Sequence, residues 1–356
     1  MLTRKLICLI GKLIFIFKRR TPPKSIKRAI IIRSGALGDV LLTTPLIKVL
    51  ADSGLEVDYC TSRWASIGLK NNPYINDILE VDDSIFFGKK DISLIKLGLF
   101  IRKEKYDAVF VLDKHWLAGI FGFLCGKFRI GFDRYGEGFA NNLNVKFGDR
   151  IYEGDKYLQL AQKLGLKIPK DYKLDYFVQK KDETYAKKIL KNKKDIICIL
   201  PGGARNPGIR NDNFRRWPID RYKDLIKKLS HNNFILILGG KDDISLTKDI
   251  KGKNILNLTG RTSIDQTAAL IKHSNMIICN DSGTMHLAGA LNDRVISIFG
   301  ATDPIRKAPK GKNMISLWKK VDNDFAESYG IYDDKLKENI KNVIVDEVYS
   351  AVKKLL

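Results

Sequence analysis

The sequence has few histidines and few cysteines, and neither residue occurs in a metal-binding spacing. Only four histidines occur in 356 residues, none of them two to five residues from another histidine or a cysteine. Structural metal sites draw paired ligands from short spacings, so such a site is not expected. The five cysteines lie singly in apolar stretches, at Cys8, Cys60, Cys125, Cys198 and Cys279. This pattern is typical of buried thiols in a reducing compartment and excludes a redox dithiol.

The apolar start of the chain is too short to cross a bilayer. Leu6 to Phe17 is apolar apart from Gly11 and Lys12, and a spanning helix needs about 20 apolar residues. Three basic residues and Thr21-Pro22-Pro23-Lys24 follow, without the small-residue cleavage site of a secretory signal. We therefore predict that residues 1–24 form a helix on the inner face of the plasma membrane, which makes the protein cytoplasmic and peripheral. A helix packed on the protein's own surface and a signal anchor are the alternatives.

Acidic residues are outnumbered, with 40 against 63 basic residues and a formal net charge of +23. Such an excess attracts polyanions, which include nucleic acid, anionic lipid and phosphorylated glycans, and charge alone does not choose among them. A chain of this length with 44% hydrophobic residues can bury a large core, and its length favours two domains.

After Pro22-Pro23, short apolar runs alternate with longer helical stretches, which predicts βαβ units and an α/β fold of two Rossmann-like, doubly wound domains. The expected divisions are a membrane-interfacial segment 1–24, a first domain 25–185, a second domain 186–330, and a C-terminal helix within 331–356 that could cross back to the first domain. Expected strands are 29–32, 55–60, 78–81, 108–112, 128–130, 196–200, 234–238, 255–258, 276–279 and 295–299. Expected helices include 40–51, 92–104, 156–164, 219–229, 264–272, 284–290 and 346–356. Ligands of open parallel sheets bind at the carboxyl ends of the strands, so two such domains predict a cleft between those ends.

The first candidate site follows the first strand, where a glycine-containing turn leads into a helix. Gly35 and Gly38 let the backbone approach a ligand, and Asp39 at the helix start could accept a proton from a sugar hydroxyl. Asp39 could instead simply cap the helix. A dehydrogenase is a further alternative, with Glu56 and Asp58 at the end of the second strand as ribose-binding acids. Only G-x-x-G is present, which argues against that alternative.

The second candidate site combines segments that follow strands of the second domain. Pro201-Gly202-Gly203-Ala204-Arg205 and Arg215-Arg216-Trp217-Pro218 supply glycines for close approach and arginines that pair with phosphate. Asn280 to His286 spans a helix start, whose backbone N–H groups form an anion site for a diphosphate. Segments 238–243 and 259–263 could hold ribose and base. Asp322-Asn323-Asp324 has the D-x-D form but reads as plain surface, so no metal is expected.

Four ordered motifs together resemble the bacterial ADP-heptose:lipopolysaccharide heptosyltransferases, which are glycosyltransferase family 9 and have the GT-B fold. The likeness runs from about Arg28 to Phe299. It is carried by Leu37 to Val40 with Thr43 and Pro45, by Arg215 to Pro218, by Leu258 to Ser263, and by Asp281 to Ala288.

The resemblance implies a role for each matching residue. Asp39 falls on the family's catalytic aspartate and Arg215 on a donor-phosphate lysine, while Asp243 and Thr262 lie near ribose- and adenine-binding positions. Asp281, Ser282, Gly283 and His286 fall on the donor-binding loop, and Gly203 and Arg205 complete the expected donor set. Apart from the resemblance, Asp113, Lys114, His115 and Arg134 lie near predicted strand ends of the first domain and are candidates for contact with charged groups of the acceptor, with ordinary surface residues as the alternative. Arg33 and Gly38 complete the expected acceptor set.

The resemblance implies an inverting, metal-independent transferase without a cofactor. It would move a heptose or similar sugar from a nucleotide-sugar donor, for which ADP-heptose is the leading candidate, to an anionic lipopolysaccharide-core-type glycolipid at the inner membrane. No nucleic-acid partner is expected. A same-fold transferase with another nucleotide sugar, an NAD-dependent oxidoreductase and a non-catalytic sugar-nucleotide-binding protein are the alternatives.

Overall fold

The computed structural model describes residues 2–15, 21–87, 92–148, 150–203, 205–206, 210–211, 213–321 and 333–356, with backbone only for 2–4, 205–206 and 210–211. The chain forms two compact units that divide between Tyr172 and Lys173, here called unit 1 and unit 2. The predicted boundary at residues 185 and 186 falls inside α9 (Lys180–Ile189), which packs on α12 (Ile264–Lys272) of unit 2. The division therefore comes earlier than expected, because α9 already belongs to unit 2.

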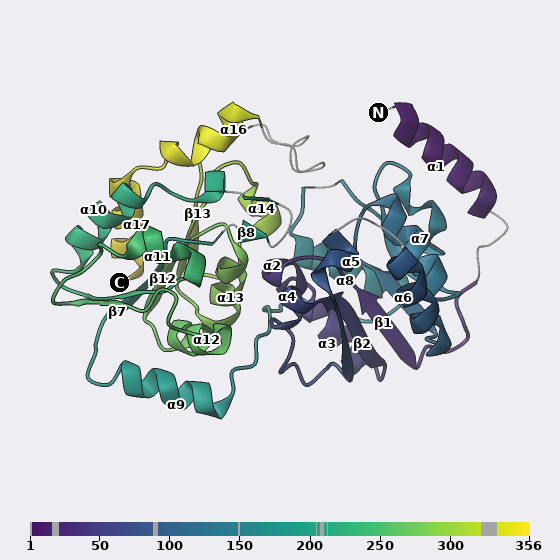
Figure 1. Cartoon of the computed structure of the whole chain (residues 1–356), viewed down its shortest axis with the longest axis horizontal. Helices are drawn as coiled ribbons and strands as arrows, with labels where there is room; N and C mark the ends of the chain where they lie inside the picture. Colours follow the sequence, from purple (N-terminus) through teal and green to yellow (C-terminus); the bar gives the residue numbers. More distant parts are fainter. Residues whose placement is uncertain are drawn as a thin grey trace. The chain divides into compact units, whose positions relative to one another are not determined.

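Unit 1 contains a parallel sheet with the order β3-β2-β1-β4-β5-β6, and unit 2 contains a second with the order β11-β10-β7-β12-β13-β14 (Figure 1). Both follow the doubly wound Rossmann order, which reverses direction between β1 and β4 and between β7 and β12. The predicted α/β class is confirmed. The unit 1 strands are β1 (Arg28–Ile32), β2 (Glu56–Ser62), β3 (Asp77–Val81), β4 (Ala108–Val111), β5 (Arg129–Asp133) and β6 (Leu143–Lys146). The unit 2 strands are β7 (Ile196–Leu200), β10 (Phe234–Ile237), β11 (Ile255–Asn257), β12 (Met276–Asn280), β13 (Val295–Ile298) and β14 (Met314–Leu317), and β8 (Arg205–Asn206) and β9 (Arg210–Asn211) form a separate antiparallel pair.

Helices cover both faces of the unit 1 sheet. Side chains of a strand alternate between faces, so Cys60 packs toward α6 (Ile92–Lys103) and α7 (Trp116–Cys125), while Tyr59 points to the opposite face. There Tyr59 Oη lies 3.0 Å from Thr43 Oγ1, beside α3 (Thr44–Asp52), which packs on α8 (Glu153–Lys163). The remaining helices in the described part of the unit are α1 (Leu2–Phe15), α2 (Leu37–Leu41), α4 (Arg63–Ser66), α5 (Asp83–Phe87) and the 3₁₀ helix η2 (Glu137–Ala140).

The single helix predicted over residues 40–51 is in fact two, α2 and α3, separated at Leu42 and Thr43. Pro45 has no N–H to donate to the carbonyl of Leu41, and that carbonyl instead accepts from Thr44 Oγ1 at 2.7 Å. The break makes α2 a short helix that starts directly at the first candidate site.

The C-terminal helix packs within unit 2. α17 (Val345–Leu355) lies against α10 (Ile219–Leu229), and Val348 and Val352 join the strands in one buried core. The indole N–H of Trp217 donates to the Val343 carbonyl at 2.8 Å and ties the chain before α17 to this core. Among the described residues, the other helices of unit 2 are α11 (Ile244–Thr247), α13 (Gly283–Leu291), α14 (Pro304–Lys307), α16 (Asp334–Glu338) and the 3₁₀ helices η3 (Asn213–Arg215), η4 (Lys241–Asp243) and η5 (Asn339–Asn342).

The first helix packs on unit 1 itself, which was the alternative in the sequence analysis. Cys8 of α1 is buried against Phe139 of η2, and the Phe15 and Phe123 rings meet edge to face at 5.0 Å. In the described part of the chain, no helix is long and apolar enough to cross a membrane.

Candidate active site

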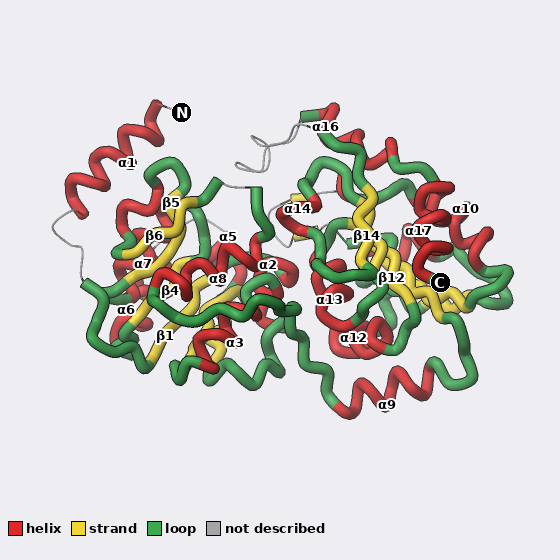
Figure 2. The backbone as a smooth tube through the Cα atoms, turned by 180° about the vertical axis from the view of Figure 1, so that it is seen from behind, coloured by secondary structure: helices red, strands yellow, loops and turns green. Residues whose placement is uncertain are grey.

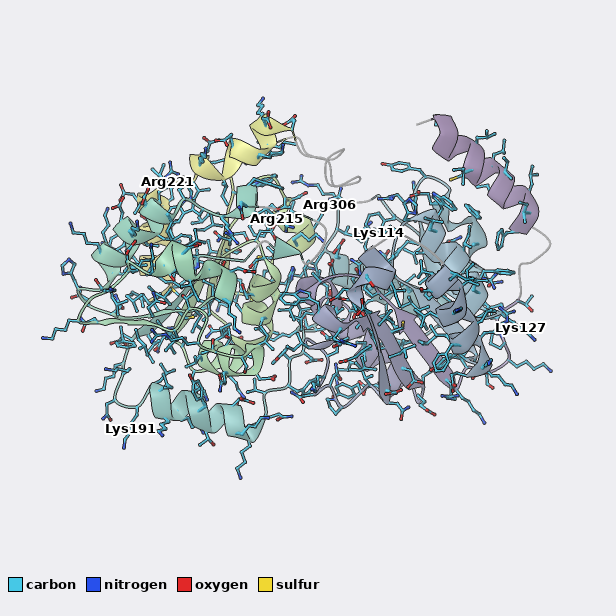
Figure 3. The ribbon with its side chains drawn as sticks, viewed as in Figure 1. Lys114, Lys127, Lys191, Arg215, Arg221 and Arg306 are labelled. Carbon is cyan, nitrogen blue, oxygen red and sulfur yellow. The ribbon has the colours of Figure 1, made fainter. Side chains whose placement is uncertain are left out.

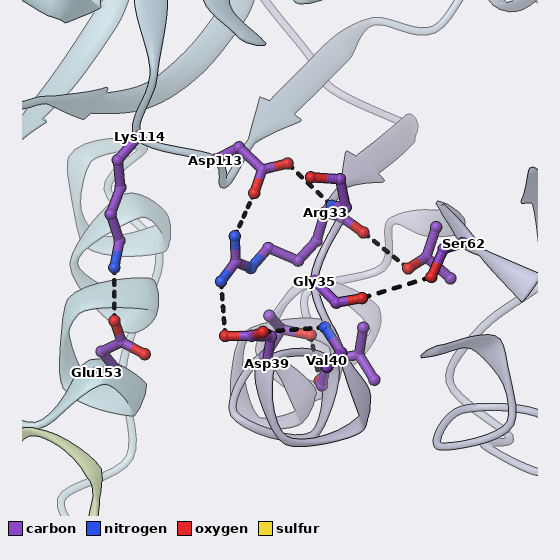
Figure 4. Close-up of polar contacts among 12 residues, drawn as sticks. Arg33, Gly35, Asp39, Val40, Ser62, Asp113, Lys114 and Glu153 are labelled. Atoms are coloured by element: carbon purple, nitrogen blue, oxygen red, sulfur yellow. Dashed lines mark hydrogen bonds and ion pairs between the residues drawn. The ribbon is translucent and has the colours of Figure 1, made fainter. Parts of the chain in front are cut away.

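The carboxyl ends of β1 and β4 bring three charged side chains of unit 1 together. Arg33 follows β1, Asp39 lies in α2 and Asp113 follows β4, so all three stand where the strand order reverses (Figure 4). The Arg33 guanidinium donates to Asp39 Oδ1 at 2.7 Å and pairs through its other terminal nitrogen with Asp113 Oδ1. The second oxygen of Asp39 accepts from the Ala36 N–H at 2.9 Å, and that of Asp113 from the Ser34 N–H at 2.9 Å.

These contacts hold the Asp39 carboxylate in one orientation without burying it. Both of its oxygens accept hydrogen bonds from donors, an arrangement that the ionised form satisfies. Its side chain remains 30% exposed, against 11% for Arg33 and 17% for Asp113. Asp39 is therefore the member of the group that a ligand can reach. The predicted capping role is also present in part, since the Ala36 N–H is a donor just before α2.

Gly35 permits this arrangement by leaving room beside Asp39. A Cβ at position 35 would lie 2.3 Å from Asp39 Cβ and 2.6 Å from its Oδ2. Any side chain there would displace the carboxylate. Gly38, the other glycine predicted to matter, is buried inside α2.

Acidic and aromatic groups surround Arg33. Burial lowers the pKa of Arg33, but Tyr157, Asp39, Asp113 and Glu153 raise it more, so that the guanidinium stays charged. Tyr157 of α8 is buried, and burial raises the pKa of its phenol. Within the described residues, neither Arg33 Nε nor Tyr157 Oη has a hydrogen-bond partner. Unsatisfied buried polar atoms beside an exposed carboxylate are features of a ligand site.

The other residues expected to contact the acceptor have partners of their own. His115 caps α7, where its Nδ1 accepts from the Leu117 N–H at 3.3 Å. Arg134 donates to the buried Glu137 at 2.9 Å. Lys114 pairs with Glu153 of α8 at 2.5 Å (Figure 4). His115 and Arg134 thus have structural contacts, and their acceptor role stays a prediction.

In unit 2, Asn280 at the end of β12 joins the two loops expected to bind the donor. Its side-chain carbonyl oxygen accepts from the backbone N–H of Trp217 at 3.0 Å and from the Tyr222 hydroxyl at 2.8 Å. Its amide donates to the carbonyls of Pro201 at 2.8 Å and Gly202 at 3.2 Å. One buried side chain therefore fixes the loop after β7 against the start of α10.

Asp243 organises the neighbouring loops after β7 and β10. Its carboxylate accepts from the Gly240 N–H at 2.9 Å, the Gly203 N–H at 3.4 Å and Arg216 at 3.3 Å. Arg216 also donates to the Gly203 carbonyl at 2.8 Å. A Cβ at position 202 would lie 2.1 Å from Asp243 Cγ, so that this position requires glycine. Asp243 is buried in these contacts, and ribose binding by it stays a prediction.

The remaining donor-set residues lie near the start of α13. Arg215 pairs with Asp281 at 3.2 Å, and Thr302 donates to the same oxygen of Asp281. Ser282 is the N-cap residue of α13, and its hydroxyl lies 2.8 Å from that of Thr284. Gly283 begins α13 and His286 is buried one turn further on. The structure therefore brings Arg215, Asp281, Ser282 and Gly283 to one helix N-terminus.

Other predicted residues lie apart from this group or outside the described residues. The Thr262 hydroxyl forms a hydrogen bond with the Thr267 hydroxyl of α12, with 2.8 Å between the two oxygens. The side chain of Arg205 and the whole of Asp322-Asn323-Asp324 fall outside the described residues. Among the described residues, no group of three or more His, Cys, Asp or Glu is placed to hold a metal ion.

Glu56 and Asp58 contradict the dehydrogenase alternative, because they begin β2 and do not end it. They pair in register with Arg28 and Ile30, at the start of β1. Asp58 accepts from Tyr106 at 2.6 Å and from Asn76 at 2.9 Å, which accounts for its burial. A ribose-binding acid would have to lie at the opposite, carboxyl edge.

Comparisons with known proteins decide the family. Residues 94–328, more than half of the chain, match the profile described as glycosyltransferase family 9 (heptosyltransferase). The chain belongs to glycosyltransferase family 9. This family 9 enzyme is 25% identical to lipopolysaccharide heptosyltransferase 3 of Escherichia coli over 90% of its own length and 95% of that relative. Its fold is similar to a family 9 structure from Veillonella parvula, with a TM-score of 0.78 and 19% identity over 94% of this chain and 99% of the other. It is also similar to E. coli heptosyltransferase WaaC with ADP-2-deoxy-2-fluoro heptose, with a TM-score of 0.69 and 17% identity over 92% and 100%.

The match confirms the predicted family, fold and class of enzyme, a glycosyltransferase. Sequence reasoning named Asn280, Arg33 and Asp113 in this family 9 enzyme but missed their structural roles, which are the loop contacts of Asn280 and the Arg33–Asp113 pair. The available signal for Asn280 was a polar residue that ends a strand of apolar residues. Figure 3 also labels Arg306, which is buried in α14 with its Nε 3.9 Å from an oxygen of Asp303.

Proposed function

We propose that this glycosyltransferase moves a heptose from ADP-heptose to an anionic, lipopolysaccharide-core-type glycolipid at the inner face of the plasma membrane. The names of its relatives support the sugar and the acceptor class, since the E. coli relative is a lipopolysaccharide heptosyltransferase. The structural neighbour that holds an ADP-linked fluoro-heptose supports the nucleotide. The reaction would belong to lipopolysaccharide core biosynthesis.

The proposed chemistry is a single displacement with inversion. An acceptor hydroxyl oxygen forms a bond to the anomeric carbon, while the bond from that carbon to the diphosphate oxygen breaks and ADP departs with the electron pair. Asp39 takes the hydroxyl proton. A carboxylate is a weak base, which suits a transition state with much sugar-cation character, because the proton is then transferred late.

Unit 2 supplies the groups proposed for the donor. The N-terminus of α13 offers backbone N–H groups without intrahelical partners, and its dipole favours an anion such as the diphosphate. Arg215 pairs with Asp281, two residues before α13, and is proposed to bind a phosphate oxygen. We propose that these groups stabilise the departing ADP and that the reaction needs no metal ion.

The observation that carries the proposal is the Asp39 carboxylate itself. It is fixed by two donors, remains partly exposed, and stands at the switch point of its sheet, where ligands of this fold class bind.

The test compares Asp39→Asn with Asp52→Asn, an exposed carboxylate of α3 in the same unit. Transfer by Asp39→Asn should fall roughly 10²- to 10⁴-fold, the usual contribution of a general base. Donor binding, measured by calorimetry, should stay within about twofold, and Asp52→Asn should behave as wild type. Undiminished turnover by Asp39→Asn would remove Asp39 from the mechanism.

A second experiment addresses the donor and the metal. A thermal-shift panel of ADP-, UDP- and GDP-sugars beside NAD should show the largest stabilisation with the ADP-sugar, because a ligand that binds only the folded state stabilises it. Stabilisation by a UDP- or GDP-sugar alone would support a same-fold transferase with another donor. Turnover should also survive EDTA, and its loss there would refute the metal-independent mechanism.

A further inference from the structure

The first helix is apolar on two sides. Cys8 and Gly11 face unit 1, where a Cβ at position 11 would lie 2.6 Å from the Phe139 ring. The outward side chains are also apolar, with Leu6, Leu9 and Leu13 at 56%, 57% and 65% exposure. A surface helix of a water-soluble protein normally carries polar residues on that side. α1 therefore has a second apolar stripe that unit 1 does not cover.

α6 repeats this pattern. Its inward residues, such as Leu97 and Ile101, belong to the core of unit 1. Its outward residues Ile92, Ile95 and Leu99 are 63%, 49% and 48% exposed. Positions 92, 95 and 99 are separated by three and four residues, so they form one stripe along the helix.

α7 lies between α1 and α6 in the views of Figures 1 and 2; α6 packs on α7, and α1 packs on η2, which also contacts α7. The Arg102 guanidinium of α6 donates to the carbonyls of Phe123 and Leu124 at 2.9 and 3.1 Å, at the end of α7. The Phe123 ring of α7 contacts Phe15 of α1. We call the outward stripes of α1 and α6 the apolar platform; it consists of Leu6, Leu9, Ile10, Leu13, Ile14, Ile92, Ile95, Leu99 and Phe100.

Every charged residue in these three helices is basic. α1, α6 and α7 contain no Asp or Glu, and α7 contains no charged residue at all. Lys5 and Lys12 are exposed on α1, and Lys96 and Lys103 are exposed on α6. Exposed apolar stripes with lysines beside them are the pattern of helices that lie in the interface of an anionic bilayer.

We propose that the apolar platform docks unit 1 on an anionic lipid bilayer, through α1 and α6 together. A second copy of the chain fits less well, because a two-fold contact would bring the same positive charges against one another. The inference extends the proposed function, since a glycolipid acceptor is held in such a bilayer. It adds α6 to the segment that the sequence analysis expected at the membrane.

The test is flotation of the full chain with vesicles of phosphatidylglycerol and phosphatidylcholine, and with phosphatidylcholine alone. The wild type should bind the anionic vesicles more tightly, and binding should weaken between about 0.1 and 0.5 M NaCl as the charges are screened.

The α1 variant is Leu6→Gln/Leu9→Gln/Leu13→Gln and the α6 variant is Ile95→Gln/Leu99→Gln. Each exposed leucine or isoleucine that enters the bilayer contributes on the order of tenfold, so we expect a loss of roughly thousandfold for the α1 variant and roughly hundredfold for the α6 variant.

Ile344→Gln/Leu356→Gln is the matched control, because both side chains are apolar and exposed in unit 2, at 51% and 58%. It should bind vesicles as the wild type does. Lys96→Gln/Lys103→Gln changes no apolar contact and should weaken binding to anionic vesicles alone, which guards against variants that simply unfold. Vesicle binding needs no donor, so its failure would leave the transferase proposal intact.

Retention of full vesicle binding by the α6 variant would overturn the joint platform, even if the α1 variant lost it. Equal binding to both kinds of vesicle would refute the electrostatic part. Light scattering gives the remaining outcome. If the wild type were a dimer that the α1 and α6 variants dissociated, the platform would be a contact between copies and the proposal would fail.

Discussion

Arg33 bridges two carboxylates from different segments, with its guanidinium 2.7 Å from Asp39 and paired on its other side with Asp113. Three segments, the ends of β1 and β4 and the start of α2, are thereby fixed to one another. The planar guanidinium offers several N–H donors in a rigid fork, which a lysine ammonium lacks. These contacts make Arg33 a positioning residue for Asp39, and its predicted contact with the acceptor stays a prediction.

Replacement of Arg33 by Lys should lower kcat about tenfold or more and change donor KM little. Lysine keeps the charge but cannot reach both carboxylates in the same geometry. The acidic limb of the pH–rate profile should also move, because the environment of the Asp39 carboxylate changes. Steady-state kinetics over a range of pH measure both effects.

Arg28→Lys is the matched control for this experiment. Arg28 begins the same strand and pairs with Glu56 and Asp58, at the amino-terminal ends of β1 and β2. Its replacement should leave the pH–rate profile unchanged. Equal profiles for Arg33→Lys and the wild type would show that Asp39 does not depend on Arg33.

Gly202→Ala should abolish donor binding and destabilise unit 2 by about 2 kcal/mol, because the new Cβ would collide with the Asp243 carboxylate. Gly240→Ala is the matched control, since a Cβ there meets Asp243 only at 3.8 Å. Urea unfolding and calorimetry with an ADP-sugar measure the two effects. Wild-type affinity in Gly202→Ala would mean that this loop does not form the donor site.

Asn280→Ala should destabilise unit 2 by about 3 kcal/mol or more, because it leaves several buried partners without a hydrogen bond. Asn254→Ala removes a single exposed hydrogen bond to the Ser230 carbonyl and should cost less than about 0.5 kcal/mol. Denaturant unfolding measures both variants. Similar stabilities for the two would show that the Asn280 contacts are not maintained in solution.

Much of the fold followed from local pattern. The buried strands β1, β4, β7 and β12 are short apolar runs, and each lies within about two residues of its predicted bounds. The edge strands β6 and β14 were missed, because Leu143–Lys146 and Met314–Leu317 are only partly buried and carry no clear period. α7 was missed for a different reason, since an apolar run of ten residues is ambiguous between strand and helix.

The sequence predicted the site residues that directly follow a strand end. It was less informative where a residue's role depends on which side chain it forms an ion pair with. Asp39 follows β1 and the Asp281–Gly283 segment follows β12, and both lie at the strand ends where the sequence predicted them. Asp243 and Arg134 were predicted as ligand contacts; the structure shows them paired with Arg216 and Glu137, and their ligand roles stay predictions. Glu137 is 3 residues from Arg134, and Arg216 is 27 residues from Asp243. The more distant pair forms only because the order of strands in the sheet brings two loops together, and no short motif encodes that order.

Cys8 should be the first of the five cysteines to react with a maleimide in the native protein. All five are buried, but Cys8 is covered only where α1 meets η2, so opening of one surface helix exposes it. Cys60, Cys198 and Cys279 lie in the sheets, where burial raises the pKa of each thiol and unfolding of a whole unit is needed to expose it. Mass spectrometry over time should show one fast modification, absent from Cys8→Ser, and Gly11→Leu should accelerate the fast phase by pushing α1 from Phe139. If Cys8 reacted no faster than Cys198, α1 would open only together with unit 1, and it would be an integral part of that unit.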